Sequence, residues 1–462
     1  MKTPTVTTRF LILFIVAIGR LSAYASDTDK NADLSLYIDN VHILNINTAQ
    51  IIRDQQLQIL NGKITAIKPA RTPITDEHHT RHDGKGSYVM PGLIDMHVHA
   101  FAPAAFTIAL SHGVTHVRLM NGVKEHLQWR KELEIGNRIG STLTVSSPII
   151  SGFKNAHIHY SAQTPAQASK AVMKAKQQGY DLIKAYGNLD APVLQALLRE
   201  AKKQKIPVAK HGPHPAPDME WNTLAGLQSL EHVEDIFQGP LNYQQDQQKL
   251  DETIVKLKTL NTPITPTLNI FWQLTEISAQ KQTFIDALPK GYISPIIALE
   301  EKQNQVKRWS KSSVEMVEHN QKTFAFLQEI TRELYRADIS LLVGSDSGVL
   351  LSPHGLATHK ELELMQQAGL PSVAVLRAAT INAAKVLGKE SEWGQVAIGY
   401  NADLILSEDN PLENLSTLQS PHAVVKHGQF FSALQLQKLR ETAIKERSFW
   451  QELNTLRNAG EL

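Results

Sequence analysis

The stretch Pro91-Gly92-Leu93-Ile94-Asp95-Met96-His97-Val98-His99 places two histidines one residue apart at the end of an apolar run. Alternating residues of a β-strand point to the same face, so a strand here presents both imidazoles side by side. Imidazole nitrogen is the commonest protein ligand for divalent metals. A His-x-His pair alone is weak evidence in a chain with 19 histidines. Its significance depends on what the rest of the chain supplies.

Composition narrows the class of protein. The chain has 462 residues, of which 42% are hydrophobic and 20% charged, which is typical of a globular protein whose length allows a large barrel. The formal net charge is +2 and no long basic run occurs, so nucleic acid is not an expected partner. Cysteine is absent, which excludes disulfides, thiolate nucleophiles and Cys-ligated zinc. Any metal must be held by nitrogen and oxygen ligands.

The N-terminus has the pattern of a secretory signal peptide. Lys2 and Arg9 precede and flank the apolar run 11–18, and Ala23-Tyr24-Ala25 fits the small-x-small cleavage rule. We expect a signal peptide over 1–25 and a periplasmic or secreted mature protein, with an uncleaved membrane anchor as the alternative. No other stretch is apolar over the ~18 residues that a membrane span requires, so no membrane contact is expected after signal removal.

Two β-rich segments flank the middle of the chain. Strands are expected at 34–38, 41–44, 56–60 and 63–67, with a hairpin turn at Asn61-Gly62 and a loop over 69–86. Further strands are expected at 393–398, 402–406 and 423–428. We predict that segments 26–90 and 391–432 combine into one small β-sandwich domain. A helix over 434–458 should fill the C-terminal segment 433–462.

Between these segments, over residues 91–390, strand-like and helix-like runs alternate. This order predicts an α/β fold, specifically a (β/α)8 TIM barrel. One connection is too long, and its excess over 270–338 should be a helical insertion, serving as a cap over the barrel mouth, an oligomer contact or a surface elaboration. The eight strand-like runs are 93–97, 113–120, 142–150, 180–185, 206–210, 227–231, 263–268 and 339–343.

Active sites of such barrels lie at the C-terminal ends of the strands. Metal-ligating residue types occupy these ends at intervals of whole strand–helix units, once the insertion is allowed for. Taken singly, Lys184 could be a substrate-binding cation of a one-metal enzyme, Asp346 a turn residue, and His214 a rival to His211. The candidate set is His97, His99, Lys184, His211, His232 and Asp346.

These motifs resemble the amidohydrolase superfamily, and within it the imidazolonepropionase-like and prolidase-like branch. The resemblance covers nearly the whole mature chain. Beyond the His-x-His entry it rests on Ile183-Lys184-x-Tyr186, Glu231-His232, Gly344-Ser345-Asp346 and the segments 378–384, 399–404 and 410–414.

The resemblance implies a site for two divalent metal ions, with zinc favoured and manganese, iron or cobalt also suited to nitrogen and oxygen ligands. His97 and His99 would bind the first ion. His211 and His232 would bind the second. Lys184 resembles the lysine that CO2 converts to a bridging carbamate, and Asp346 resembles the aspartate that binds the first metal and shuttles the proton.

Substrate contacts are implied less directly. A histidine after the third strand contacts the scissile carbonyl in similar enzymes, which points to His159, and Tyr186 should line the pocket. Arg118 or Lys154 could hold a substrate carboxylate or form a structural ion pair. Related dipeptidases often carry a tyrosine after the strand-five histidine, where this chain has Gly212-Pro213.

The expected function is hydrolysis of an amide-type C–N bond by a metal-bridging hydroxide, with Asp346 moving the proton to the leaving nitrogen. The substrate would be a small peptide-like molecule or N-acylated amino acid, and the enzyme a homo-oligomer. Without cysteine or a Gly-x-Ser-x-Gly motif, no covalent nucleophile is evident. One alternative is hydrolysis or deamination of a cyclic amide or imidazolone-type ring, and another is a catalytically inactive binding protein.

Overall fold

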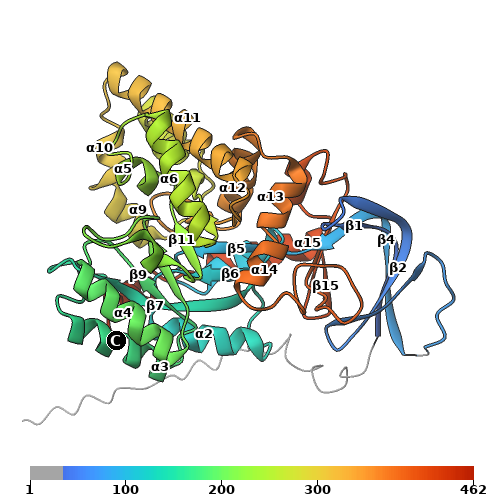
Figure 1. Cartoon of the computed structure of the whole chain (residues 1–462). Coiled ribbons are helices and arrows are strands. Elements are labelled where there is room, and N and C mark those ends of the chain that lie inside the picture. Colours follow the sequence, from blue (N-terminus) through green and yellow to red (C-terminus); the bar gives the residue numbers. More distant parts are fainter. Residues whose placement is uncertain (1–34, 77) are drawn as a thin grey trace, which may run out of the picture.

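The computed structural model describes residues 35–76 and 78–462 (Figure 1). The predicted signal peptide therefore lies outside the described residues. Among the helices of the described ranges, none has the length and apolar character needed to cross a membrane.

A parallel sheet positions the predicted ligands. Seven of its strands follow one another in chain order, and the short β8 (His159–Ser161) pairs with β7 outside this path. The seven are β5 (Leu93–Val98), β6 (Val114–Leu119), β7 (Thr142–Ser151), β9 (Leu182–Ala185), β10 (Val208–His211), β11 (Ser229–Glu231) and β12 (Ile264–Thr265).

The expected eighth strand, 339–343, makes bridges instead of a continuous ladder. The amide of Leu342 donates to the carbonyl of Ile264 on β12 (2.9 Å), and Met96 on β5 donates to Val343 (2.8 Å). This segment therefore lies between the first and last strands of the sheet, and the α/β fold is TIM-barrel-like. Contact with β5 continues beyond this segment, because the amide of Asp346 donates to the His97 carbonyl (2.8 Å) and the amide of His99 donates to the Ser347 carbonyl (2.8 Å).

Helices that cover the sheet begin and end where the sequence caps them. The Thr164 side chain accepts from the amide of Gln167 at the start of α3 (Pro165–Gln178), and the left-handed Gly179 ends that helix. The other covering helices are α1 (Ala104–Ser111), α2 (Lys124–Glu134), α4 (Ala191–Gln204), α5 (Glu234–Gln238), α6 (Gln247–Leu260), α12 (Leu356–Gln367), α13 (Ser372–Ala378) and α14 (Ile381–Val386).

The long connection after β12 is helical, as expected. Figure 1 shows it in yellow to orange, gathered on one side of the barrel. A small apolar core that includes Ile277, Phe284 and Val306 packs its helices together. These helices are α7 (Leu268–Gln280), α8 (Gln282–Ala287), α9 (Pro295–Glu301), α10 (Gln305–Trp309) and α11 (Val314–Arg336).

Both flanking segments contribute strands to one seven-stranded sheet, in the order β15-β14-β13-β4-β1-β2-β3, away from the barrel in Figure 1. Asn61-Gly62 forms the predicted hairpin, and both residues have positive φ, as a two-residue turn of this kind requires. A division into the two packed layers of a β-sandwich stays a prediction. The strands are β1 (Ser35–Asn45), β2 (Gln50–Leu60), β3 (Lys63–Pro69), β4 (His79–Pro91), β13 (Leu404–Ser407), β14 (Ala423–Lys426) and β15 (Gln429–Ser432).

Four local predictions are wrong. The loop 69–86 contains half of β4, because its polar residues pair in parallel with β1. The two strands 34–38 and 41–44 are one strand, β1, with an irregularity near the left-handed Asn40. Residues 393–398 form bends and no strand. The C-terminal helix is two helices, α15 (Ala433–Lys445) and α16 (Phe449–Arg457), since the Ser448 side chain caps a new start.

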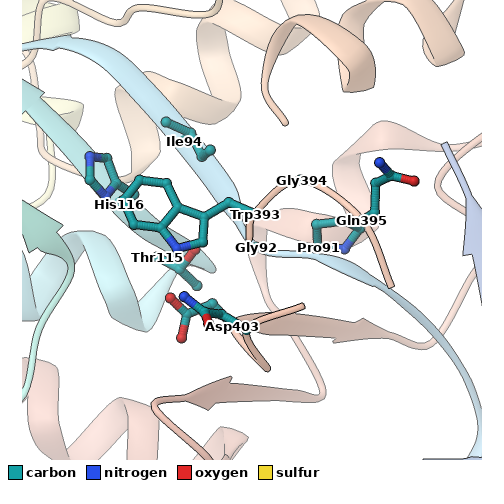
Figure 2. Close-up of a pocket in the computed structure, with 10 residues that line it drawn as sticks. Pro91, Gly92, Ile94, Thr115, His116, Trp393, Gly394, Gln395 and Asp403 are labelled. Carbon is teal, nitrogen blue, oxygen red and sulfur yellow. The ribbon is translucent and has the colours of Figure 1, made fainter. Parts of the chain in front are cut away.

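A small crevice lies where β4 of the seven-stranded sheet leads into β5 of the parallel sheet. Figure 2 shows Trp393 beside His116, with Asp403 below them. The crevice holds only about 10 Å³, which is about the space of one water molecule. It also lies at the N-terminal end of β5, whereas His97 and His99 lie at the C-terminal end.

Candidate metal centre

All six predicted ligands line one cavity of about 790 Å³. They lie at or just beyond the C-terminal ends of β5, β9, β10, β11 and the segment 339–343. Parallel strands of a barrel end at the same rim, which is why residues up to 249 positions apart (346 − 97) come together.

His97, His99 and Asp346 form the tightest cluster. One Asp346 carboxylate oxygen, Oδ1, lies 3.0 Å from Nε2 of His99 and 3.5 Å from Nε2 of His97. One ligand atom from each of the three residues lies within 4.8 Å of the others, a geometry that could hold a metal ion.

The buried carboxylate of Glu231 fixes the orientation of His97. Nδ1 of His97 is hydrogen-bonded to Glu231 (2.8 Å), so Nε2 of His97 faces the cavity. Glu231 also accepts from Arg118 (2.8 Å), which donates to the Met96 carbonyl as well (2.7 Å). Arg118 is fully buried, so it forms the structural ion pair and not a substrate contact. Outer partners of this kind orient metal-binding imidazoles.

The other histidines are arranged in the same way. Nδ1 of His232 is hydrogen-bonded to the Thr267 hydroxyl (2.7 Å). Nε2 of His211 lies 3.1 Å from an Asp235 carboxylate oxygen, and Tyr186 stacks on the His211 ring at 3.9 Å between centroids. Each of the two imidazoles therefore has one nitrogen near a neighbouring side chain and the other left for a ligand.

Burial sets the protonation of this cluster. It lowers the pKa of His97 to about 4, and those of His211 and His232 well below the usual value. These imidazoles are therefore neutral at pH 7, the form that binds metal. Burial opposes ionisation of Asp346, but His97, His99 and His232 hold its pKa below the usual range, so it is a carboxylate.

Three buried polar atoms at this centre make no hydrogen bond within the described residues: Nζ of Lys184, Nδ1 of His211 and Oδ1 of Asp346. Leaving a buried polar atom unsatisfied costs about 1–3 kcal/mol, so such atoms call for a partner. A divalent cation would satisfy the imidazole and carboxylate atoms. The all-nitrogen and oxygen donor set fits a divalent metal such as zinc or manganese.

Both predicted substrate contacts also line the cavity. His159 is hydrogen-bonded through Nδ1 to the Ser151 hydroxyl (3.0 Å), and its ring meets Tyr186 edge-on at 4.9 Å. Neither His214 nor Lys154 is among the lining residues. Within the described chain, the cavity thus receives His211 and not its rival.

Several lining residues were not predicted. They come from the helix after β11, from the insertion and from the C-terminal tail, where no strand-end rule applies. Among them, only the acidic pair Glu234-Asp235 could have been expected at the cavity from the sequence, because it directly follows His232. The main ones are Glu234, Asp235, Glu300, Glu301, Leu453, Leu456 and Arg457.

Comparison with known proteins defines the class. The amidohydrolase family model matches residues 88–430. Ochratoxinase of Aspergillus niger is 34% identical over 101 residues, which is 21% of this chain and 20% of that protein. Adenine deaminase 2 of Bradyrhizobium sp. (strain ORS 278) is 34% identical over 65 residues, 14% of this chain and 11% of the relative. The aligned parts thus span about a fifth or less of these relatives.

Solved structures share the fold over most of the chain. A putative prolidase from Bifidobacterium longum superposes with a TM-score of 0.69 at 22% identity, over 89% of this chain and 99% of that one. Bottromycin amidohydrolase superposes with a TM-score of 0.72 at 22% identity, over 89% and 90%. The A. niger ochratoxinase structure gives 0.61 at 18% identity, over 87% and 96%.

The family match covers more than half of the chain and spans every predicted ligand. The chain belongs to the amidohydrolase family. This confirms the resemblance drawn from the motifs.

Proposed function

We propose that the protein is an exported, metal-dependent hydrolase of the amide bond in a peptide-like or N-acylated amino acid. The observation that carries this proposal is the ring of strand-end donors around one cavity, including buried donor atoms that make no hydrogen bond within the described part of the chain. The cavity of about 790 Å³ is large enough for a substrate of that size.

The donor set divides into two metal sites sharing one lysine. The first would use Nε2 of His97, Nε2 of His99 and the Asp346 carboxylate. The second would use His211 and His232. Lys184 lies with them, and addition of its neutral Nζ amine to CO2, with loss of a proton, would give an anionic carbamate whose oxygens could bind metal.

Divalent ions bound here would polarise the substrate carbonyl and make a water molecule acidic near neutral pH. Asp346 then accepts a proton and delivers it to the leaving nitrogen, because its carboxylate faces the cavity and is ionised. His159 would contact the scissile carbonyl. Glu231 and Thr267 keep His97 and His232 oriented throughout.

Carbamate formation on Lys184 should depend on pH. Burial lowers the pKa of this lysine to about 8, and only the neutral amine attacks CO2. At fixed dissolved CO2, the neutral fraction rises from roughly 3% at pH 6.5 to roughly three quarters at pH 8.5. We expect ¹³C-labelled CO2 to give a stronger carbamate NMR signal at pH 8.5. Equal signals at both pH values, or a signal retained in Lys184→Ala, would contradict this assignment.

The function itself is tested by a substrate screen. The protein loaded with zinc or manganese in bicarbonate should release amino acid from N-acyl amino acids or dipeptides. Chelation should abolish this activity and the metal should restore it. Cleavage restricted to hydantoin- or imidazolone-type rings would favour the alternative of ring hydrolysis or deamination. If the protein binds no metal and hydrolyses none of these compounds, the result would favour the alternative of a catalytically inactive binding protein.

Export, a periplasmic or secreted location and a homo-oligomeric state belong to the same proposal. The pattern of residues 1–25 supports the exported location.

A further inference from the structure

The C-terminal helix α16 forms part of the cavity wall. Leu453, Leu456 and Arg457 follow the i, i+3, i+4 spacing of one helix face, and all three line the cavity. Ile297, Glu300 and Glu301 of α9 line it as well, and α9 contacts α16. We call these two helices the roof of the site. The tail therefore contributes directly to a site whose ligands all lie at least a hundred residues earlier in the chain.

A buried ion pair holds the roof together. Arg447 donates to Glu452 at 2.9 Å, and the two side chains are 6% and 0% exposed. Arg447 also donates to the Gly291 carbonyl (2.8 Å), and the Ser294 hydroxyl donates to Glu452. Because these contacts join the tail to the insertion beside α9, they fix the position of α16 over the cavity.

The last residues of the tail pack against the loop that carries His159. Gly460 has φ of 84°, and a Cβ at this position would lie 2.9 Å from the His159 carbonyl carbon. Only glycine allows this close approach without strain. Lys174 on α3 donates to the Leu462 carbonyl (2.9 Å), which holds the chain end in place. The tail thus borders the cavity on two sides, at the roof and behind His159.

Charge distinguishes one residue of α16. Apart from the histidines, the lining side chains among the described residues include two cations, Lys184 and Arg457. Lys184 belongs to the metal centre. Outside the six ligands, the other charged side chains of the lining are carboxylates, including Glu234 and Asp235, and Tyr186, His157 and His159 complete its ionisable groups. A substrate carboxylate would be repelled by these acids, so α16 offers the one cationic position for it within the described wall.

Arg457 is suited to that task. It is exposed and takes part in no ion pair among the described residues, in contrast to Arg447. A guanidinium binds a carboxylate through two parallel hydrogen bonds, which supply orientation as well as attraction. Leu453 and Leu456 on the same helix face provide apolar surface for a side chain or acyl group next to that carboxylate.

We propose that Arg457 binds the free carboxylate of the substrate, so that α16 selects amides that carry a carboxylate over neutral amides. This inference rests on the proposed function and narrows its substrate class to N-acyl amino acids or dipeptides with a free carboxylate. Neutral cyclic amides and peptide amides should be poor substrates.

The test compares an N-acyl amino acid with its own C-terminal amide. In Arg457→Gln, kcat/KM for the acid should fall roughly 10–100-fold, mainly through KM, because one charge-assisted contact is lost. Activity on the neutral amide should stay near that of the wild type. Lys438→Gln is the matched control, since Lys438 is an exposed residue of α15 outside the cavity lining and the charge change is the same. Lys438→Gln should leave kcat/KM unchanged for both the acid and the amide.

Two results would overturn the role of Arg457: equal losses on acid and amide in Arg457→Gln, or a wild-type preference for the amide. Calorimetry, which measures binding of the N-acyl amino acid to the metal-loaded protein, provides a readout independent of turnover. If the wild type hydrolyses neither compound, the proposed function fails, yet weaker binding confined to Arg457→Gln would still support the carboxylate site. Unchanged binding would refute it.

Discussion

Replacing Asp346 with asparagine should lower kcat by roughly 10²–10⁴-fold while leaving substrate binding largely intact. Asparagine preserves the shape of the side chain and one oxygen, but it cannot accept and return a proton. The carboxylate lies 3.0 Å from Nε2 of His99 and faces the cavity. Burial opposes its ionisation, yet the surrounding imidazoles keep its pKa below the usual range, so the native residue is ready to act as a base.

Steady-state kinetics and metal analysis together decide what Asp346 does. Asp338→Asn is the matched control, because that side chain is 91% exposed and precedes the same segment. The control should keep wild-type kcat and metal content. A near-normal kcat in Asp346→Asn would remove the residue from the mechanism. A fall in kcat that follows loss of the first metal ion, and is reversed by excess metal, would limit Asp346 to a ligand role.

The placement of the ligands follows from the regular alternation of strands and helices along the chain, which can be recognised in the sequence. His97, Lys184, His211 and His232 occupy strand ends separated by whole strand–helix units. A parallel barrel brings all such ends to one rim whatever the helices between them contain. The predicted set therefore lines one cavity even though individual strand boundaries shift by one to a few residues.

The partners that orient these ligands follow no such rule. Glu231 reaches back to His97 across 134 residues and to Arg118 across 113. These contacts depend on how neighbouring strands are packed, which composition and spacing do not specify. The same holds for α16, because its place at the cavity is set by the Arg447–Glu452 pair and the insertion it binds.

The local errors have a common cause in tertiary context. Residues 79–86 are polar and contain Gly84 and Gly86, which favour a loop, but the backbone of β1 supplies pairing partners for them. Residues 393–398 end in the apolar run Val396-Ala397-Ile398, which favours a strand, yet Gly394 adopts φ of 87° and Trp393 packs on His116. The break before α16 has a local cause in the sequence, since Ser448 is of the residue types preferred at a helix N-cap.

Replacing Lys184 with alanine should remove one of two metal ions per chain and most of the activity. The side chain is 1% exposed and its Nζ makes no hydrogen bond in the described structure, so the metal-free protein does not depend on it for polar contacts. The metal-loaded protein does, if a carbamate on this lysine bridges both ions. Loss of even an outer partner weakens metal binding about 10–100-fold, so loss of a bridging ligand should exceed that.

Metal content by mass spectrometry and thermal unfolding with and without metal separate the two roles that Lys184 can have. A lysine that serves only packing would lower the melting temperature of both forms equally and leave the metal count unchanged. A carbamate ligand predicts the opposite: a modest change without metal and a much smaller stabilisation on adding metal. Acetate or propionate should partly restore metal binding, because a small carboxylate can enter the space left by the side chain and supply the missing oxygens. Lys438→Ala on α15 should show none of these effects, and an unchanged metal count in Lys184→Ala would refute the carbamate.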